Sequence, residues 1–201
     1  VLELVDGDRV NEMKCRIERL VYELCGQDKD KEKQKKKRSE NLTLNPKWLN
    51  GATGTNVLSE DGKTFTKQKI GYSSISSTGP VTHWRVKYLG TIENSMFGWL
   101  LIGVHSDPAN ATQNSQRDKE CFGMNVTIHG NSGNGTWRGG VRVQHGGLTV
   151  GVGDVICAEV VDNQLTVRME NGAWSKTIDL PAGRTWYPHF NPFAASFTLL
   201  P

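Results

Sequence analysis

Apolar side chains recur at helical spacing in the first part of the chain. The residues that share this spacing are three and four positions apart, as the a and d positions of a heptad are: Val10, Met13, Ile17, Leu20 and Leu24. The pattern predicts a short α-helix over residues 1–27, and a helix of two heptads is marginal in isolation. Two interpretations stay open, namely the end of a self-associating coiled coil and a single helix packed against the β region. In both, these side chains make packing contacts and carry no chemistry.

From residue 41 onward apolar positions alternate with polar ones, and turn residues occur at short intervals. Residues 83–90, HWRVKYLG, alternate as a strand with one wet face does. Residues 98–104, GWLLIGV, are continuously apolar, which predicts a strand covered on both faces. Further strands are predicted within residues 141–150 as a hairpin, within 154–174 as a pair joined at Asp162 and Asn163, and within 197–201. The pattern predicts an all-β fold over residues 41–201, a bent antiparallel β-sandwich.

Composition narrows the class of protein. In 201 residues the hydrophobic share is 36%, which is ordinary for a globular chain, and no apolar run approaches the ~20 residues that span a bilayer. The four cysteines form no CxxC pair, and the chain opens without the features of a signal peptide. We therefore expect reduced thiols in a cytoplasmic protein without a membrane partner, with the nucleus as the alternative location.

The net charge of +3 is concentrated in one stretch. Residues 28–40 hold seven Lys or Arg side chains against four Asp or Glu, so the β region is nearly neutral. We interpret the stretch as a solvated basic linker, with a nuclear-localisation signal or a phosphate-binding patch as alternatives. Because the β region lacks the basic footprint of a duplex-binding protein, nucleic acid is not the expected partner.

The templates of catalysis and metal binding are missing from the sequence. There is no GxGxxG that opens a helix, no P-loop and no GxSxG, and the five histidines form no HxH or HExxH motif. The glycine-rich stretch at residues 130–140 predicts a flexible loop. We expect no enzyme activity, no cofactor and no metal ion.

Several fragments of the β region, in their order along the chain, resemble PRY–SPRY domains. NLTLNP at residues 41–46 followed by NVLSEDGKTFTK at residues 56–67 resembles the opening of the PRY segment. GDVICAEVVDNQLTVRMENG at residues 153–172 resembles the most specific hairpin of the SPRY part, and WYPHFNPFAASFTLLP at residues 186–201 resembles its ending. The helix and linker upstream fit the layout of tripartite-motif proteins.

This resemblance implies a concanavalin-like sandwich that binds a protein or peptide through loops at one side and has no catalytic residues. It also implies a role in substrate recognition for a ubiquitin ligase. The positions that match pocket-forming strands and loops of tripartite-motif members are Asn125, Thr127, Asn191 and Phe193. Residue chemistry adds aromatic and planar polar side chains of the kind enriched at interfaces, expected in loops or at the rim: Tyr72, Trp137, Arg138, His145 and Trp186.

Some aromatic side chains have a packing interpretation as well. Trp84 and Trp99 are expected on inner faces of the sandwich, Phe190 in the core and Phe193 exposed. Core packing and pocket lining stay open for Trp137, Arg138 and Trp186.

Two other functions remain open at this stage. A lectin-like sandwich that binds carbohydrate fits the aromatic side chains and the Asn-rich loops, although no calcium-binding constellation is evident. Association with nucleic acid through the basic linker is the third hypothesis, and its binding would fall steeply as salt rises.

Overall fold

A computed structural model describes residues 16–17, 41–51, 56–92, 98–128, 135–145 and 148–201. The chain divides into two units, residues 1–37 and 38–201. In the first unit Arg16 and Ile17 are helical and exposed. The other four seam positions (Val10, Met13, Leu20 and Leu24) and the linker at residues 28–40 lie outside the described residues. Self-association through this helix therefore stays a prediction.

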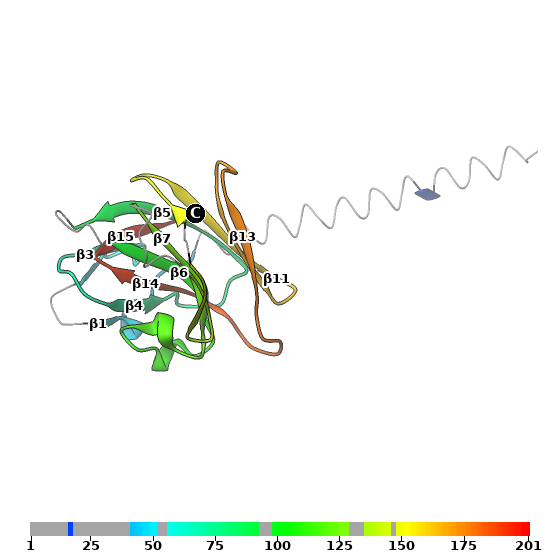
Figure 1. The fold of residues 1–201 in the computed structure, drawn as a ribbon, viewed down its shortest axis with the longest axis horizontal. Helices are drawn as coiled ribbons and strands as arrows, with labels where there is room; N and C mark the ends of the chain where they lie inside the picture. The colour runs from blue at the N-terminus through cyan, green and yellow to red at the C-terminus, as the bar shows by residue number, and fades with distance from the viewer. Residues whose placement is uncertain (1–15, 18–40, 52–55, 93–97, 129–134, 146–147) are drawn as a thin grey trace, which may run out of the picture. The chain divides into compact units, whose positions relative to one another are not determined.

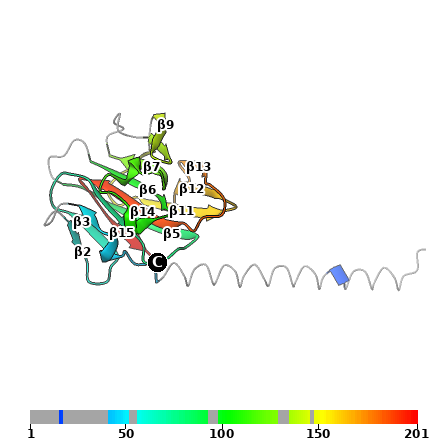
Figure 2. The ribbon, with the colours of Figure 1, turned by 90° about the horizontal axis from the view of Figure 1, so that it is seen from below.

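The second unit is a sandwich of two β-sheets (Figures 1 and 2). The larger sheet contains, in spatial order, β1 (Asn50–Gly51), β4 (Ser73–Ser76), β14 (Tyr187–Phe193), β6 (Trp99–His105), β7 (Cys121–Thr127), β8 (Gly135–Arg138) and β9 (Val141–His145). These strands pair antiparallel, and the short β10 (Leu148–Thr149) pairs with β7 in parallel.

The smaller sheet is antiparallel throughout its described strands. In spatial order it contains β13 (Ser175–Asp179), β12 (Gln164–Met169), β11 (Val155–Val161), β5 (His83–Thr91), β15 (Ala195–Leu200), β3 (Thr64–Lys67) and β2 (Asn56–Leu58). The described connections contain the 3-10 turns η1 (Pro46–Trp48), η2 (Pro108–Asn110) and η3 (Ser115–Arg117). The predicted antiparallel β-sandwich is confirmed.

The core lies between the two sheets and follows the alternation seen in the sequence. On β5, Trp84, Val86 and Tyr88 are fully buried, whereas Lys87 is exposed on the other face. On β6 the even-numbered positions join this core, and Leu101 packs on the opposite face in a second cluster with Cys121 and Trp137. The continuous apolar run thus forms a strand covered on both faces, as predicted.

Two local predictions are wrong. Residues 141–150 do not form a hairpin, because β9 pairs with β8 while β10 pairs with β7. Residues 135–138, expected within a flexible loop, form β8. In both cases long-range pairing with β7 overrides the turn propensity of the glycines nearby. The hairpin of β11 and β12 is confirmed, and its turn residues Asp162 and Asn163 both have positive φ.

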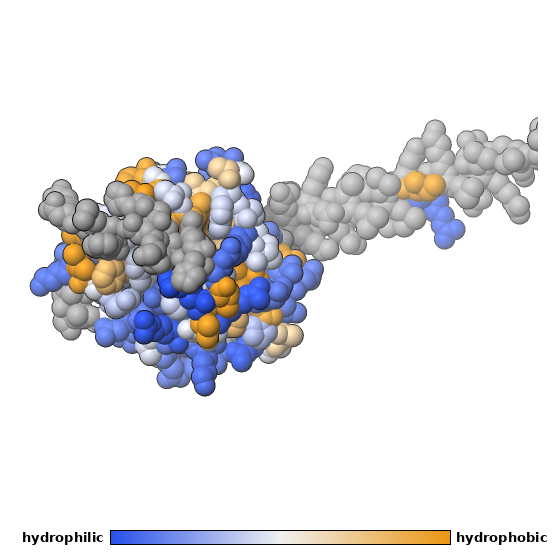
Figure 3. Space-filling model, viewed as in Figure 1, coloured by the Kyte–Doolittle hydropathy of each residue, from blue (hydrophilic) through white to orange (hydrophobic). Residues whose placement is uncertain are grey.

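The surface of the sandwich is mostly polar. Figure 3 shows one face, on which hydrophilic side chains predominate and hydrophobic ones form small patches. Among the described residues of this unit, the exposed large hydrophobic side chains are Val57, Ile70, Tyr72, Leu89, Val141, Val143, Val152 and Val161.

One lysine of the smaller sheet is buried. Lys67, at the end of β3, is only 4% exposed and has no carboxylate partner among the described residues. Its Nζ donates hydrogen bonds to Asn56 Oδ1 at 2.9 Å and to Ser73 Oγ. Burial lowers the pKa of Lys67 to about 8, because the low-dielectric surroundings disfavour the ammonium form.

We expect Lys67→Met to raise the free energy of unfolding near pH 7 by about 1–2 kcal/mol, after allowance for solvent screening. Ser73 Oγ also donates to Asn56 Oδ1, so these two groups keep a partner. The gain should shrink as the pH rises from about 8 to above 10. Over that range the folded chain has released the Lys67 proton while the unfolded chain still binds it, so rising pH stabilises the wild type through this group.

Urea unfolding of both proteins near pH 7 and near pH 10 measures the effect. Lys69→Met, at an exposed position two residues away, is the control and should change stability little at either pH. Equal stability of Lys67→Met and wild type near pH 7 would contradict the prediction.

Candidate functional site

The larger sheet has a second side-chain layer on its outer face, the face that points away from the core. Side chains alternate along a strand, so the neighbours of core residues on β6 and β14 point outward. Leu101 lies on this face, and Trp99 packs against its cluster. The outer face therefore presents apolar and aromatic groups that the core of the sandwich does not use.

Three aromatic rings meet at one end of the outer face, and we call them the aromatic cluster: Tyr72, Trp99 and Phe193. Tyr72 forms a β-bridge with Phe193, and Phe193 is paired with Trp99 across β14 and β6. Ring centroids are 5.0 Å apart for Tyr72 and Phe193 and 5.8 Å apart for the other two pairs. Trp99 was expected on an inner face, and this is wrong, because Leu100 takes the core position and turns its neighbour outward.

A segment at residues 106–118, the cover loop, crosses the outer face. Asn191 on β14 holds it through two hydrogen bonds and makes a third to Ser73 on β4. Its Nδ2 donates to the carbonyls of Ser73 at 2.6 Å and Gln113 at 2.8 Å, and its Oδ1 accepts from the backbone N–H of Gln116 at 3.5 Å. Asn125 on β7 donates to Gln116 Oε1 at 3.2 Å. Buried amides on the strands thus fix the position of the loop.

Two histidines lie beneath the cover loop. The hydroxyls of Ser76 and Ser115 are each 2.6 Å from a ring nitrogen of His189, and the rings of His189 and His105 are 5.0 Å apart. Burial lowers the pKa of both, and each effect is dominated by the cost of burying an imidazolium, despite Asp118 beside His105. Because Ser115 and His189 are fully buried, this serine–histidine contact is closed to a substrate.

The β8–β9 hairpin stands opposite the aromatic cluster. Gly139 and Gly140 form its two-residue turn with φ of 57° and 81°, as a type I′ turn requires. A Cβ atom on Gly140 would lie 2.3 Å from the carbonyl oxygen of Arg117, so glycine lets the tip contact the cover loop. Behind the tip, Trp137 on β8 pairs with Arg142 on β9.

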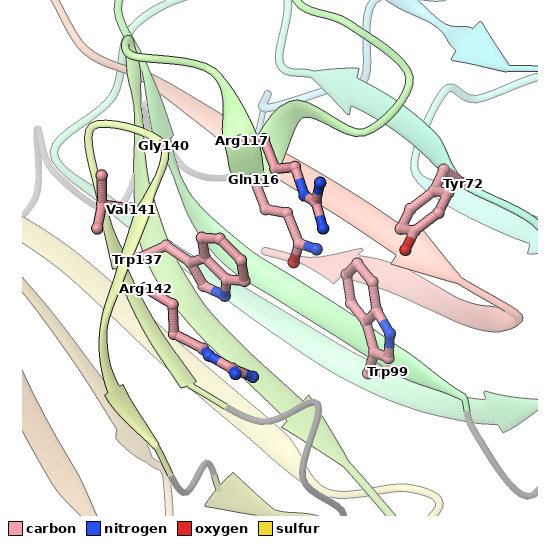
Figure 4. Close-up of a pocket in the computed structure, with 8 residues that line it drawn as sticks. All are labelled: Tyr72, Trp99, Gln116, Arg117, Trp137, Gly140, Val141 and Arg142. Carbon is pink, nitrogen blue, oxygen red and sulfur yellow. The ribbon is translucent and has the colours of Figure 1, made fainter.

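These elements enclose a pocket of about 520 Å³. It is lined by Tyr72, Trp99, Gln116, Arg117, Trp137, Gly140, Val141 and Arg142. In Figure 4, Tyr72 and Trp99 stand on one side and Trp137 with Arg142 on the other, while Gln116 and Arg117 reach in from the cover loop. Three parts of the fold that are distant in sequence therefore supply its walls.

The pocket combines aromatic walls with positive charge. Two guanidinium groups, Arg117 and Arg142, line it, and no carboxylate does so within the described residues. Arg117 is exposed and has no ion-pair partner among those residues. The indole N–H of Trp137, buried in the wall, likewise has no hydrogen-bond partner in the described part of the chain. The arrangement suits a ligand that brings an apolar group and a negative charge.

Neither a metal cluster nor a membrane-spanning helix occurs in the described ranges. No group of three or more His, Cys, Asp or Glu side chains there is placed to hold a metal ion. In the same ranges, no helix has the length and apolar character needed to traverse a bilayer.

The sequence-predicted site residues fall into two groups. Tyr72 and Trp137 line the pocket, and Phe193 belongs to the aromatic cluster beside it. Arg138 follows Trp137 but points elsewhere, 3.3 Å from Asp179 of the smaller sheet. The backbone of His145 lies on β9, and its side chain is outside what the structure describes.

The other predicted residues are buried and require correction. Asn125 and Asn191 are under the cover loop, and Thr127 Oγ1 donates to the carbonyl of Gly98 at 3.0 Å. Trp186 is in the core, edge-to-face with Phe122 at 5.3 Å between centroids. Asn125, Thr127 and Asn191 have inward contacts and at most 2% exposure, whereas Trp186 takes the core position that the sequence left open.

Sequence reasoning missed six lining residues: Trp99, Gln116, Arg117, Gly140, Val141 and Arg142. The two glycines at residues 139 and 140 are flanked by residues that alternate between apolar and polar. This pattern could have indicated the hairpin that carries Arg142. No sequence signal marks Gln116 or Arg117, because the cover loop has neither periodicity nor a motif.

Comparison with known proteins supports the fold. No family model and no curated protein matches the chain. Among solved structures, the SPRY domain of human HERC1 aligns with a TM-score of 0.55 at 12% identity over 78% of this chain and 96% of that one. The TRIM65 PSpry domain aligns with a TM-score of 0.57 at 16% identity over 80% and 90%. The fold of the chain is that of a SPRY domain.

A more distant likeness is to the carbohydrate-binding module CBM66 from Bacillus subtilis. It aligns with a TM-score of 0.47 at 11% identity over 79% of this chain and 93% of that one. A likeness of this degree carries no argument about function.

Proposed function

We propose that this chain is a protein-interaction module that holds a segment of a partner protein in the pocket between the aromatic cluster and the β8–β9 hairpin. The observation that carries the proposal is the lining of the pocket. Aromatic rings and two guanidinium groups surround a volume of about 520 Å³. Trp, Tyr and Arg are the residue types that dominate the binding energy of protein interfaces. The SPRY fold is consistent with this role.

Binding proceeds by burial of one anchor side chain. An apolar or aromatic group of the partner enters between Trp99 and Trp137 and displaces water from both rings. Arg117 and Arg142 then orient the partner backbone or its polar groups through charge-assisted hydrogen bonds. Because Asn191 and Asn125 fix the cover loop beforehand, little conformational entropy is lost on binding.

A finer proposal concerns the fate of the partner. The resemblance to tripartite-motif proteins suggests that the bound protein is a substrate presented to a ubiquitin ligase. In that role the sandwich selects the substrate, and polypeptide beyond the sandwich supplies the transfer chemistry.

The test compares partner capture by wild type and by a pocket variant, Tyr72→Ala with Trp99→Ala. Cross-linking in cells followed by mass spectrometry should show proteins that wild type captures and the variant loses, by tenfold or more in recovered amount if each ring contributes about 1 kcal/mol or more. Val161→Ala, at an exposed position on β11, is the control and should capture the wild-type set. Tyr72→Ala alone removes a surface ring and guards against misfolding caused by loss of Trp99.

Two results would reject the proposal. Recovery of the same proteins by wild type and by the folded pocket variant would show that the pocket is not the binding site. Specific signals on a glycan array that disappear with Trp99→Ala would favour the carbohydrate-binding alternative instead.

A further inference from the structure

The charged side chains that line the pocket are all positive within the part of the chain that the structure describes. Arg117 enters from η3 and Arg142 from β9, so the two guanidinium groups come from separate elements that the hairpin tip brings together at Gly140. A carboxylate nearby is engaged elsewhere. Asp118 accepts from Thr112 N at 2.8 Å and Thr112 Oγ1 at 2.7 Å, and lies 3.5 Å from His105.

A third arginine, on the same hairpin as Arg142, does not line the pocket. Arg138 pairs with Asp179 on the smaller sheet at 3.3 Å and is not among the lining residues. The pocket lining thus holds two arginines, Arg117 and Arg142, and no carboxylate among the described lining residues.

Two valines are exposed on β9, on either side of Arg142. Val141 is 62% exposed and Val143 is 52% exposed, and both lie on β9, the strand at one edge of the larger sheet (Figure 2). Single-stranded nucleic acid is bound by a groove in which positive side chains follow successive phosphates. Here the lining supplies only two positive side chains among the described residues, and the neighbours of Arg142 on β9 are valines. A row of positive side chains that could follow successive phosphates is therefore not seen in the described part of β9.

We propose that the pocket is selective for an acidic polypeptide segment, in which an aromatic or large aliphatic anchor is flanked by Asp or Glu. This inference rests on the proposed function and names the partner class of the same site. The anchor fills the space between Trp99 and Trp137, and carboxylates on either side meet Arg117 and Arg142. Charge complementarity of this kind sets partner choice and the rate of association.

A second copy of the chain is a poorer occupant of this site. Its own β9 region would bring Arg142 toward Arg142 and would add further positive charge to a pocket that already holds two guanidinium groups. Like charges brought together at an interface oppose association.

Selection of peptides from a phage-displayed random dodecapeptide library tests the inference. On the full wild-type chain, enriched peptides should carry an aromatic or large aliphatic residue flanked by Asp or Glu. On the double variant Arg117→Glu with Arg142→Glu, enrichment should switch to Lys and Arg around the anchor. Arg138→Glu is the control, because it makes the same change of charge at an arginine that pairs with Asp179 and does not line the pocket. This variant should select the same acidic peptides as wild type.

Affinities of one enriched synthetic peptide then give the magnitude. By fluorescence anisotropy, it should bind the double variant at least about tenfold more weakly than wild type and should lose affinity as salt rises. Neutral or basic peptides enriched on wild type, or equal loss with Arg138→Glu, would overturn the inference. Binding of poly-uridine in the same assay, lost in the double variant, would also overturn it in favour of nucleic acid.

The outcomes separate this inference from the proposed function. If enriched peptides lose binding with Tyr72→Ala and Trp99→Ala but show no charge preference, the pocket is a peptide site and the acidic partner is wrong. If they bind those variants as well as wild type, the proposed site itself is wrong.

Discussion

Replacing Gly103 with alanine is expected to lower the free energy of unfolding by about 3–5 kcal/mol. Gly103 lies in the middle of β6 and faces Gly123 of β7. A Cβ atom on Gly103 would be 2.1 Å from the carbonyl oxygen of Phe122 and 2.7 Å from Cα of Gly123. Both are backbone atoms of a neighbouring interior strand, so relief requires the two strands to move apart and weakens their hydrogen bonds.

Gly79→Ala is the matched control, because a Cβ atom there has no neighbour within 4 Å and its backbone does not require glycine. Urea denaturation should show a lower midpoint for Gly103→Ala and little change for Gly79→Ala. If Gly103→Ala does not fold, its circular dichroism spectrum should lack the β-sheet signal that the Gly79→Ala control shows. That result would correspond to a loss of stability large enough to unfold the protein. Equal stability of the two variants would mean that the strands do not approach as closely as described.

Replacing Asn191 with leucine should cost about 3 kcal/mol of stability and loosen the cover loop. The leucine has a similar volume but leaves the carbonyls of Ser73 and Gln113 and the N–H of Gln116 without their partner. An unsatisfied buried polar group costs about 1–3 kcal/mol, and part of this will be recovered by water at the partly buried contact with Gln113.

Hydrogen exchange distinguishes a local role from a general one. In Asn191→Leu, hydrogen exchange relative to wild type should increase more for the amides of residues 113–117 than for those of β5. A peptide that binds at the pocket should also bind this variant more weakly than wild type. Asn110→Leu removes an exposed amide that donates to Asp107 at 2.9 Å, and it serves as the control with little expected change. Uniformly faster exchange across both sheets would show that Asn191 supports the whole sandwich and not the loop in particular.

The fold could be predicted from the sequence because the sandwich depends on short-range alternation. On β5, Trp84 and Val86 are separated by a polar residue, and that pattern alone gives both the strand and its buried face. Asp162 and Asn163 tolerate positive φ and so mark their hairpin directly. Where a strand is apolar throughout, as β6 is, the pattern predicts the strand but not which face each residue takes, and the prediction for Trp99 is wrong for that reason.

The site was predictable only in part because long-range packing creates it. Asn191 and Asn125 are polar residues on strands, which ordinarily indicates a solvent-facing side. The cover loop reverses this by crossing the outer face, and its own sequence has no feature that announces the crossing. Arg117 and Arg142 are 25 positions apart in sequence and lie at one pocket because the hairpin tip at Gly140 fits against η3.

The position of the last two strands bears on how the protein is made. β15 lies between β5 and β3, and β14 lies between β4 and β6, so each completes the middle of a sheet from the end of the described chain. A ribosome delivers these two strands after all the other described strands of the sandwich, and until then both sheets are split and strands such as β5 expose side chains destined for the core. The nascent chain must therefore be kept from aggregating until β14 and β15 have been made, and the sandwich closes in a step that joins the halves of both sheets.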